Sequence, residues 1–225
     1  MIIAGLDEAG RGPVIGPFVI GCVVIKESEL HVLDEIVVDD SKKISPKKRA
    51  ILVEKIKNIS LAYKSLIISP QEINDLHYSK HITLNQIEEQ KFAELLNSMK
   101  PTPDVIYLDA ADTVEDRFGI TIKALLTFTP DKVISKHRGD AIFKIVGASS
   151  ILAKTVRDQE IEKYKIQYGD FGSGYPSDPK TKRFLKEYYG KNQKFPPFVR
   201  TWWKTAENIV TAYKEGRTQK KITDF

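Results

Sequence analysis

The sequence predicts an α/β fold in which helices flank a mixed sheet, followed by a smaller helical lobe. Apolar runs at residues 1–6 and 18–25 open the chain, and runs of this length next to glycine are typical of buried strands. Strand-like and helix-like segments then alternate as far as residue 168, which favours a sheet covered by helices. Beyond that point only helices and loops are indicated.

The first two strands are expected to pair as a hairpin. Ser45 and Pro46 then mark the start of a helix, because serine caps helices and proline suits the first helical position. This helix should run to about Ile59. Further strands are predicted at residues 61–68, 104–108 and 133–135.

Two later helices carry start signals. Thr83 and Gln86 have the spacing of a capping box, in which each side chain satisfies a backbone N–H group of the other. Asp140 is placed to cap a long helix that should extend from about residue 142 to residue 168.

The composition shifts towards loops and helices near the end of the chain. Asp178 should cap a helix that stops at Gly190. A final helix carries, at helical spacing, Trp203, Ala206, Val210 and Tyr213. Trp202 and Trp203, which follow Arg200, are expected to pack in the lobe rather than to stack on bases. We therefore expect a main domain at residues 1–170, a helical lobe at 171–216 and a flexible, mostly polar tail at 217–225.

Composition narrows the class of protein. The 225 residues are 41% hydrophobic and 29% charged, as in soluble globular proteins with one good core. The net charge of +5 fits a polyanionic partner. Cys22 is the single cysteine, so neither a disulfide framework nor a cysteine zinc site is expected. His77 and His81 are four residues apart, but no helical pattern surrounds them and no third metal ligand is evident.

No export signal or membrane span is expected. Asp7 and Glu8 interrupt the apolar N-terminus before a secretory signal core can form. The longest apolar run, residues 13–25, contains two prolines and is shorter than the roughly 20 residues that a membrane span needs. We expect a monomeric, cytoplasmic protein that does not bind membranes.

Acidic side chains end three of the strand-like runs: Asp7 with Glu8, then Asp109, then Asp140. Ligands gather at strand ends in sheets of this class. For Asp7 and Glu8 to meet at one point the backbone must bend after Asp7, and Gly10 and Gly12 allow that bend. Clustered carboxylates repel one another unless a cation is present, and oxygen-only sites suit Mg²⁺ or Mn²⁺ over Zn²⁺. Two such ions about 4 Å apart would serve phosphodiester cleavage. Taken singly, each acid also fits a solvated strand end.

Six segments, in order along the chain, resemble the signature motifs of type 2 ribonuclease H, the ribonuclease HII family. They are residues 7–13, 40–43, 107–112, 136–140, 148–154 and 172–178. The resemblance extends from residue 5 to about residue 204, and its overall pattern is most similar to the archaeal branch. Six motifs in the same order are far more specific than any one of them.

The resemblance implies a ribonuclease H-like sheet and an endonuclease that cuts RNA in RNA–DNA hybrids and single ribonucleotides embedded in duplex DNA. The cut would fall on the 5′ side of the ribonucleotide and leave a 3′-hydroxyl and a 5′-phosphate. The four metal-binding carboxylates of the family map to Asp7, Glu8, Asp109 and Asp140, with two Mg²⁺ or Mn²⁺ ions expected during catalysis. Asp112 ranks below these four, as an acid at a helix start.

The same resemblance implies substrate contacts. Gly10, Arg11 and Gly12 would read the ribose 2′-hydroxyl through backbone groups, because glycine lets the main chain approach a ligand closely. Tyr175 would stack on the sugar that follows the ribonucleotide, although most loop tyrosines simply pack. Candidate phosphate contacts are Lys42, Lys43, Ser149, Ser150, Lys154 and Arg157. As an alternative role, the two serines bond to a preceding helix carbonyl.

The end of the chain resembles a peptide that docks onto sliding clamps of the proliferating-cell-nuclear-antigen type. Gln219, Ile222 and Phe225 occupy relative positions 1, 4 and 7. A short 3₁₀-like turn would put the two apolar side chains on one side, and the glutamine would fill a polar pocket.

Two other functions fit parts of the sequence. A junction resolvase would use a similar two-metal site, and an all-DNA substrate would distinguish it from the ribonuclease. A non-catalytic nucleic-acid binder would need only the basic surface, and all four carboxylates would then be dispensable.

Overall fold

The computed structural model describes residues 1–36 and 44–223, and it describes side chains up to residue 216. The strands are β1 (Ile2–Ala9), β2 (Phe18–Lys26), β3 (Ala62–Ile68), β4 (Val105–Asp109) and β5 (Lys132–Lys136). The helices are the 3₁₀ turn η1 (Glu27–Glu29), α1 (Leu30–Ile36), α2 (Pro46–Ile59), α3 (Pro70–Lys80), α4 (Leu84–Asn97), α5 (Glu115–Ala124), α6 (Gly139–Ile142), α7 (Lys144–Tyr168), α8 (Pro179–Asn192) and α9 (Lys204–Thr223).

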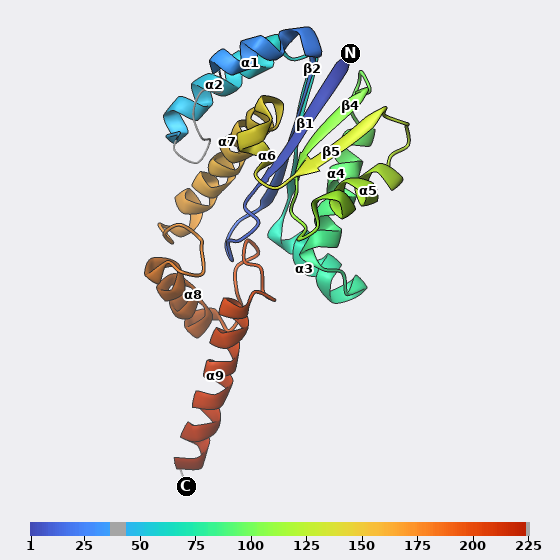
Figure 1. Ribbon diagram of the computed structural model, residues 1–225. Coiled ribbons are helices and arrows are strands. Elements are labelled where there is room, and N and C mark those ends of the chain that lie inside the picture. Colours follow the sequence, from blue (N-terminus) through green and yellow to red (C-terminus); the bar gives the residue numbers. More distant parts are fainter. Residues whose placement is uncertain (37–43, 224–225) are drawn as a thin grey trace. The chain divides into compact units, whose positions relative to one another are not determined.

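The strands form a mixed sheet in the order β3-β2-β1-β4-β5 (Figure 1). β1 and β2 pair antiparallel, from Ile2 opposite Lys26 to Ala9 opposite Val19, which confirms the predicted hairpin. β4 lies parallel to β1, and β5 lies parallel to β4. These three strands therefore end at the same edge of the sheet, where the residues that follow them are brought together.

Contacts divide the chain into two compact units. The first unit comprises residues 1–9, 18–67 and 82–159, and the second comprises residues 10–17, 68–81 and those from 160 onward. The segment between β1 and β2 thus belongs to the second unit, although both of its flanking strands belong to the first.

In the first unit, helices cover both faces of the sheet. Figure 1 shows α1, α2 and α7 on one side and α4 and α5 on the other. The core on the α7 side joins Ile3 and Val23 of the sheet to Ile145 and Ile151 of α7. The helix lies so close to the sheet that a Cβ added to Gly5 would lie 2.4 Å from the Ile145 carbonyl oxygen.

The second unit has an aromatic core. Phe171 and Phe198 are completely buried there, together with Leu185 of α8, and Trp203 packs against them as expected. Asp178 caps α8 as predicted, by accepting a hydrogen bond from the Lys180 N–H group.

The caps of two further helices are confirmed. Ser45 accepts the Lys48 N–H ahead of α2. The Thr83 and Gln86 side chains form both halves of the predicted capping box of α4. The strands at residues 61–68, 104–108 and 133–135 appear as β3, β4 and β5, with ends shifted by one residue or so. Within the described ranges, no helix combines the length and apolar character needed for a membrane crossing.

Two local expectations were wrong. His77 lies inside α3 and His81 forms its C-cap with φ of 54°, so a helix does surround them. Its apolar pattern is weak, because its buried residues are only Pro70, Ile73 and the polar Asn74. Asp140 does not cap the long helix. It lies inside the short helix α6, and α7 starts four residues later.

Candidate active site

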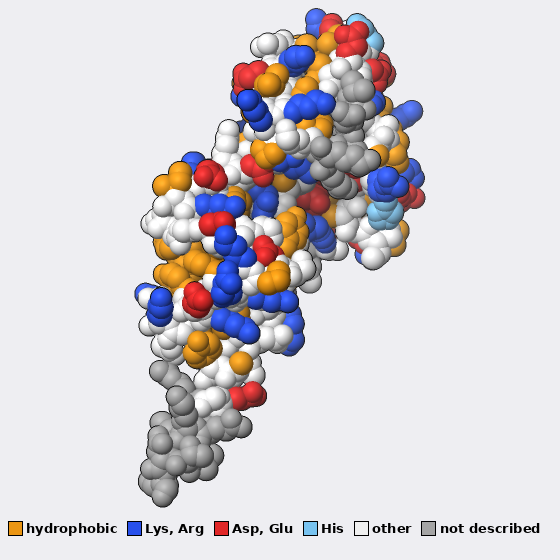
Figure 2. All heavy atoms as spheres, turned by 90° about the vertical axis from the view of Figure 1, so that its left-hand side faces the viewer, with side chains coloured by type: hydrophobic (Ala, Val, Ile, Leu, Met, Phe, Trp, Pro, Cys, Tyr) orange, Lys and Arg blue, Asp and Glu red, His pale blue; other side chains and the backbone are white. Residues whose placement is uncertain are grey.

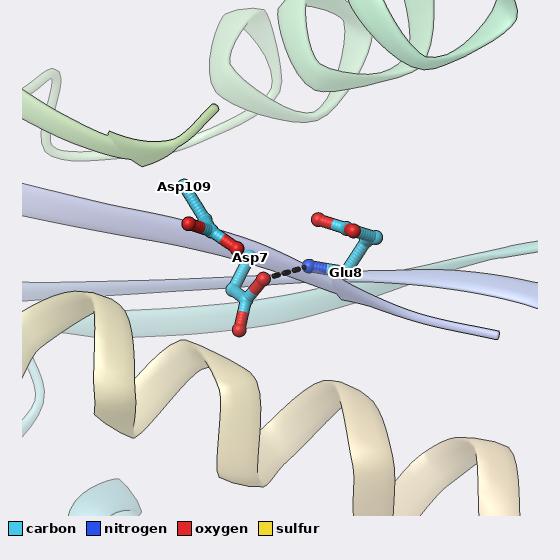
Figure 3. A group of neighbouring side chains, drawn as sticks. All are labelled: Asp7, Glu8 and Asp109. Carbon is cyan, nitrogen blue, oxygen red and sulfur yellow. Dashed lines mark hydrogen bonds between the residues drawn. The ribbon is translucent and has the colours of Figure 1, made fainter. Parts of the chain in front are cut away.

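Three of the predicted carboxylates meet where β1 and β4 end. Asp7 and Glu8 are the two residues of β1 before its last residue, Ala9, and Asp109 ends β4. The parallel register sets Leu6 beside Leu108, so Asp109 follows directly at the level of Asp7. One carboxylate oxygen from each of the three lies within 4.8 Å of the others, and Figure 3 shows them around the end of β1. The expected bend comes later than predicted, because β1 stays paired through Ala9.

Asp7 is the most strongly perturbed of these acids. Its side chain is only 3% exposed. Burial raises the pKa of Asp7 well above its ordinary value, and the nearby Glu8 raises it further. A hydrogen bond with Ser150 and the charge of Lys154 act in the opposite direction. Since these groups do not fully offset the burial, the protein alone stabilises the ionised carboxylate poorly.

A divalent cation fits this donor set. The three side chains offer only carboxylate oxygens, which are the ligands that Mg²⁺ and Mn²⁺ prefer. A bound cation would also neutralise the repulsion that raises the pKa of Asp7. Asp7, Glu8 and Asp109 are therefore the residues that would hold the ion.

Helix α7 provides two side chains, Ser150 and Lys154, that interact with Asp7. The Lys154 ammonium group donates to the Ser150 hydroxyl, which in turn interacts with Asp7. Ser149 is completely buried, and its hydroxyl donates to the main-chain oxygens of Gly5 at 2.7 Å and Ile145 at 3.1 Å. Of the two roles considered for Ser149, the bond to a helix carbonyl is the one present.

The fourth predicted carboxylate, Asp140, is not part of this group of three. It is half-buried in α6. The N–H of the preceding Gly139 donates to Asp109 Oδ1 at 2.7 Å. A Cβ on Gly139 would lie 2.8 Å from the Leu108 carbonyl oxygen, so glycine is what allows α6 to reach the end of β4.

The loops after β4 and β5 are held by two other acids. Asp112 is 4% exposed and pairs with Arg117, which holds the pKa of Asp112 well below its usual range. Glu115 accepts hydrogen bonds from the His137 N–H at 2.6 Å and from Lys136 Nζ at 2.9 Å. Asp112, just ahead of α5, is thus paired with an arginine of that helix.

In the second unit, the Gly-Arg-Gly turn and Tyr175 come together. Gly10 adopts φ of 88°, a conformation that favours glycine. A Cβ on Gly12 would lie 3.5 Å from the Tyr175 ring, and Tyr175 is 44% exposed. The Gly174 carbonyl accepts hydrogen bonds from the N–H groups of residues 14 and 15 at 2.9 and 3.2 Å, which fixes the tyrosine loop beside the turn.

Sequence reasoning missed one residue at this turn. Arg200 is completely buried, and its guanidinium donates to the carbonyl oxygens of Gly10 and Arg11. The only sequence signal is an arginine next to two tryptophans, which does not reveal partners almost 190 residues away.

Of the candidate phosphate contacts, Lys154 and Arg157 are half-buried on α7. Lys42, Lys43 and Phe225 lie outside the described residues, as do the side chains of Gln219 and Ile222.

The chain is similar to ribonucleases HII over almost its whole length. The family model described as Ribonuclease HII matches residues 4–206. The Ribonuclease HII of Pyrococcus furiosus is 48% identical over 225 residues, which cover all of this chain and 98% of that protein.

Solved structures agree with this match. The ribonuclease H2 of Pyrococcus horikoshii OT3 superposes with a TM-score of 0.89 at 47% identity, covering 95% of this chain and 99% of that chain. A chain from the PCNA:RNase HII complex of Archaeoglobus fulgidus matches with a TM-score of 0.81 at 36% identity, covering 92% and 96% respectively.

Proposed function

This chain belongs to the ribonuclease HII family and is a ribonuclease H endonuclease, and from that premise we propose its substrates and its chemistry. It cuts RNA in RNA–DNA hybrids and at single ribonucleotides embedded in duplex DNA. The cut falls on the 5′ side of the ribonucleotide and leaves a 3′-hydroxyl and a 5′-phosphate. The observation that carries this proposal is the carboxylate group of Asp7, Glu8 and Asp109 in a chain that also builds the Gly-Arg-Gly turn against Tyr175.

Ribonucleases H use divalent metal ions, and the acidic cluster fits that use. We propose Mg²⁺ or Mn²⁺, with two ions present during catalysis and Asp140 as the fourth ligand residue. When bound, such ions supply an activated water and stabilise the leaving oxygen. The chain's own contribution is placement: Ser150 and Lys154 orient Asp7, and Gly139 orients Asp109.

Recognition of the ribose rests on the second unit. Residues Gly10, Arg11 and Gly12 present main chain to the 2′-hydroxyl, the group that distinguishes RNA from DNA. Tyr175 stacks on the next sugar, where the exposed part of its ring is available.

Basic side chains suit the phosphate backbone of the duplex. Helix α8 carries exposed basic residues at Lys182, Arg183, Lys186 and Lys191. In Figure 2, Lys and Arg side chains gather on the face where α8 lies. Arg157, Lys154 and the lysines at positions 42 and 43 remain candidate phosphate contacts as well. Such contacts release counterions, so binding should weaken as salt rises.

The direct test is cleavage of duplex DNA that carries one ribonucleotide, with the cut mapped at nucleotide resolution. We expect cutting on the 5′ side in Mg²⁺ and none in excess chelator. A four-way junction made only of DNA is the control, because a junction resolvase would cut it. Cleavage of that junction, or turnover without divalent ions, would refute the proposal.

The similarity to the RNase HII chain of the PCNA complex supports one partner. We propose that this chain also binds a sliding clamp, through Gln219, Ile222 and Phe225 at its end.

A further inference from the structure

The carbonyl groups of the Gly-Arg-Gly turn all accept hydrogen bonds from one short segment of the chain. Arg200 donates from Nη2 to the Gly10 oxygen at 2.6 Å and from Nη1 to the Arg11 oxygen at 3.0 Å. Trp203 donates from Nε1 to the Gly12 oxygen at 3.1 Å. Three consecutive carbonyls are therefore fixed by two side chains that lie three residues apart.

The arginine is suited to this role and is held firmly in place. Its third guanidinium nitrogen, Nε, donates to the Gly16 oxygen at 3.1 Å, so one side chain binds both the turn and the segment that follows it. A planar guanidinium carries five donors in a fixed fork, whereas lysine offers a single point charge. The guanidinium carbon lies 4.8 Å from the centre of the Trp203 ring, which links the two donors.

Helix α3 braces the segment that carries these donors. The buried Asn74 side chain donates to the Val199 carbonyl and accepts from the Thr201 N–H, both at 2.9 Å. His77 stacks on Trp202 with ring centres 3.9 Å apart. Main-chain bonds from Gly16 N to Phe198 O and from Arg200 N to Val14 O close the other side, both at 2.9 Å.

We propose that Arg200 and Trp203 are positioning residues for ribose recognition: they hold the Gly-Arg-Gly main chain in the one conformation that accepts a 2′-hydroxyl. The inference rests on the proposed function of that turn. Loss of a donor leaves a turn carbonyl unsatisfied, and the turn then samples other conformations. Preference for the ribonucleotide should fall, while general binding of duplex, which depends on phosphate contacts, should persist.

The chain offers a closely matched pair of variants. Trp203→Phe removes the N–H that reaches Gly12 and keeps an aromatic ring beside Arg200. Trp202→Phe is the control, because it keeps an aromatic ring beside His77 and because, within the described part of the chain, the Trp202 Nε1 makes no hydrogen bond. Arg200→Lys is the stronger perturbation. If Arg200→Lys fails to fold, Trp203→Phe alone tests the inference.

The measurement is the ratio of two dissociation constants, for an all-DNA duplex and for the same duplex with one ribonucleotide. Fluorescence anisotropy with Ca²⁺ in place of Mg²⁺ gives both, with a gel to show that the duplexes stay intact. A loss of folded protein changes both constants equally, so the ratio reports on recognition alone.

We expect the ratio to fall about three- to tenfold in Trp203→Phe, as for the loss of one hydrogen bond, and further in Arg200→Lys. Trp202→Phe should match the wild type. An unchanged ratio in Trp203→Phe, or an equal fall in affinity for both duplexes, would overturn the inference while leaving the proposed function intact. A wild-type protein with no preference between the duplexes would overturn both.

Discussion

Single residues at the sheet edge combine function with a cost in stability. Asp7 is nearly excluded from water and lies beside Glu8, so the folded protein without metal disfavours its ionised form. Arrangements of this kind are frequent at functional sites. A conservative substitution of Asp7 can therefore test its effect on cleavage and its effect on stability separately.

Asp7→Asn should abolish cleavage, by roughly a thousandfold or more, because it removes a ligand oxygen from the proposed metal site. Binding of the ribonucleotide duplex should persist. Asp104→Asn is the control, since the Asp104 carboxylate accepts the Ile2 N–H at the other end of β1. Single-turnover assays and anisotropy measure the two properties, and near-normal cleavage by Asp7→Asn would contradict the metal mechanism.

The raised pKa of Asp7 also predicts that the stability of the protein depends on pH when a chelator has removed divalent ions. A carboxyl whose folded pKa is raised contributes stability at pH values below its unfolded pKa, and this contribution is lost as pH rises through the folded pKa. The melting temperature of wild type relative to Asp7→Asn should therefore fall as pH rises above about 4. Mg²⁺ should restore the wild type but not the variant. A difference that stays constant with pH would argue against a raised pKa.

At the residue scale the sequence was informative where function and local pattern coincide. Asp7, Glu8 and Asp109 could be predicted to meet because each ends a strand-like run, and parallel strands share an edge. Arg200 could not, because its partners are main-chain oxygens that any residue supplies. Residue types and their positions reveal the carboxylate group, whereas the hydrogen bonds of Arg200 exist only in the folded chain.

At the scale of elements, capped and strongly patterned segments were predicted well. The capping residues Ser45 and Thr83 predicted the starts of α2 and α4. Two apolar runs predicted the β1–β2 hairpin. α3 was missed because few of its residues are buried, and one of these, Asn74, is polar and makes two hydrogen bonds to the main chain. The start of α7 was displaced because a separate short helix, α6, precedes it.

The contact of α7 with the sheet gives a prediction for glycine. Gly5→Ala would set a Cβ 2.4 Å from the Ile145 backbone, so the helix must move away from the strands. We expect the free energy of unfolding to fall by about 3 kcal/mol. Gly216→Ala, where an added Cβ meets nothing within 4 Å, should instead raise it by up to about 1 kcal/mol. Urea denaturation measures both, and similar values for the two variants would contradict the close packing of α7.

At the scale of the whole molecule, activity and clamp binding should separate. Deletion of residues 219–225 removes the proposed clamp motif and leaves residues 4–206, the extent of the family match, intact. We expect clamp binding, measured by surface plasmon resonance, to be lost and cleavage of a short duplex to be unchanged. A deleted chain that binds the clamp as well as the full chain would exclude the tail as the docking segment.

The assignment of residues 10–17 to the second unit limits where the chain can be cut into working fragments. Residue 10 comes two positions after Glu8 in the sequence, yet residues 10–17 belong to the compact unit that otherwise comprises residues 68–81 and those from 160 onward. A fragment that stopped at residue 159 would keep every proposed metal ligand and lose Arg200, Trp203 and the Gly174 carbonyl, the groups that hold the turn. Neighbouring residues in the sequence thus supply the acids and the turn proposed to read the ribose, but the groups that hold the turn lie in the last quarter of the chain.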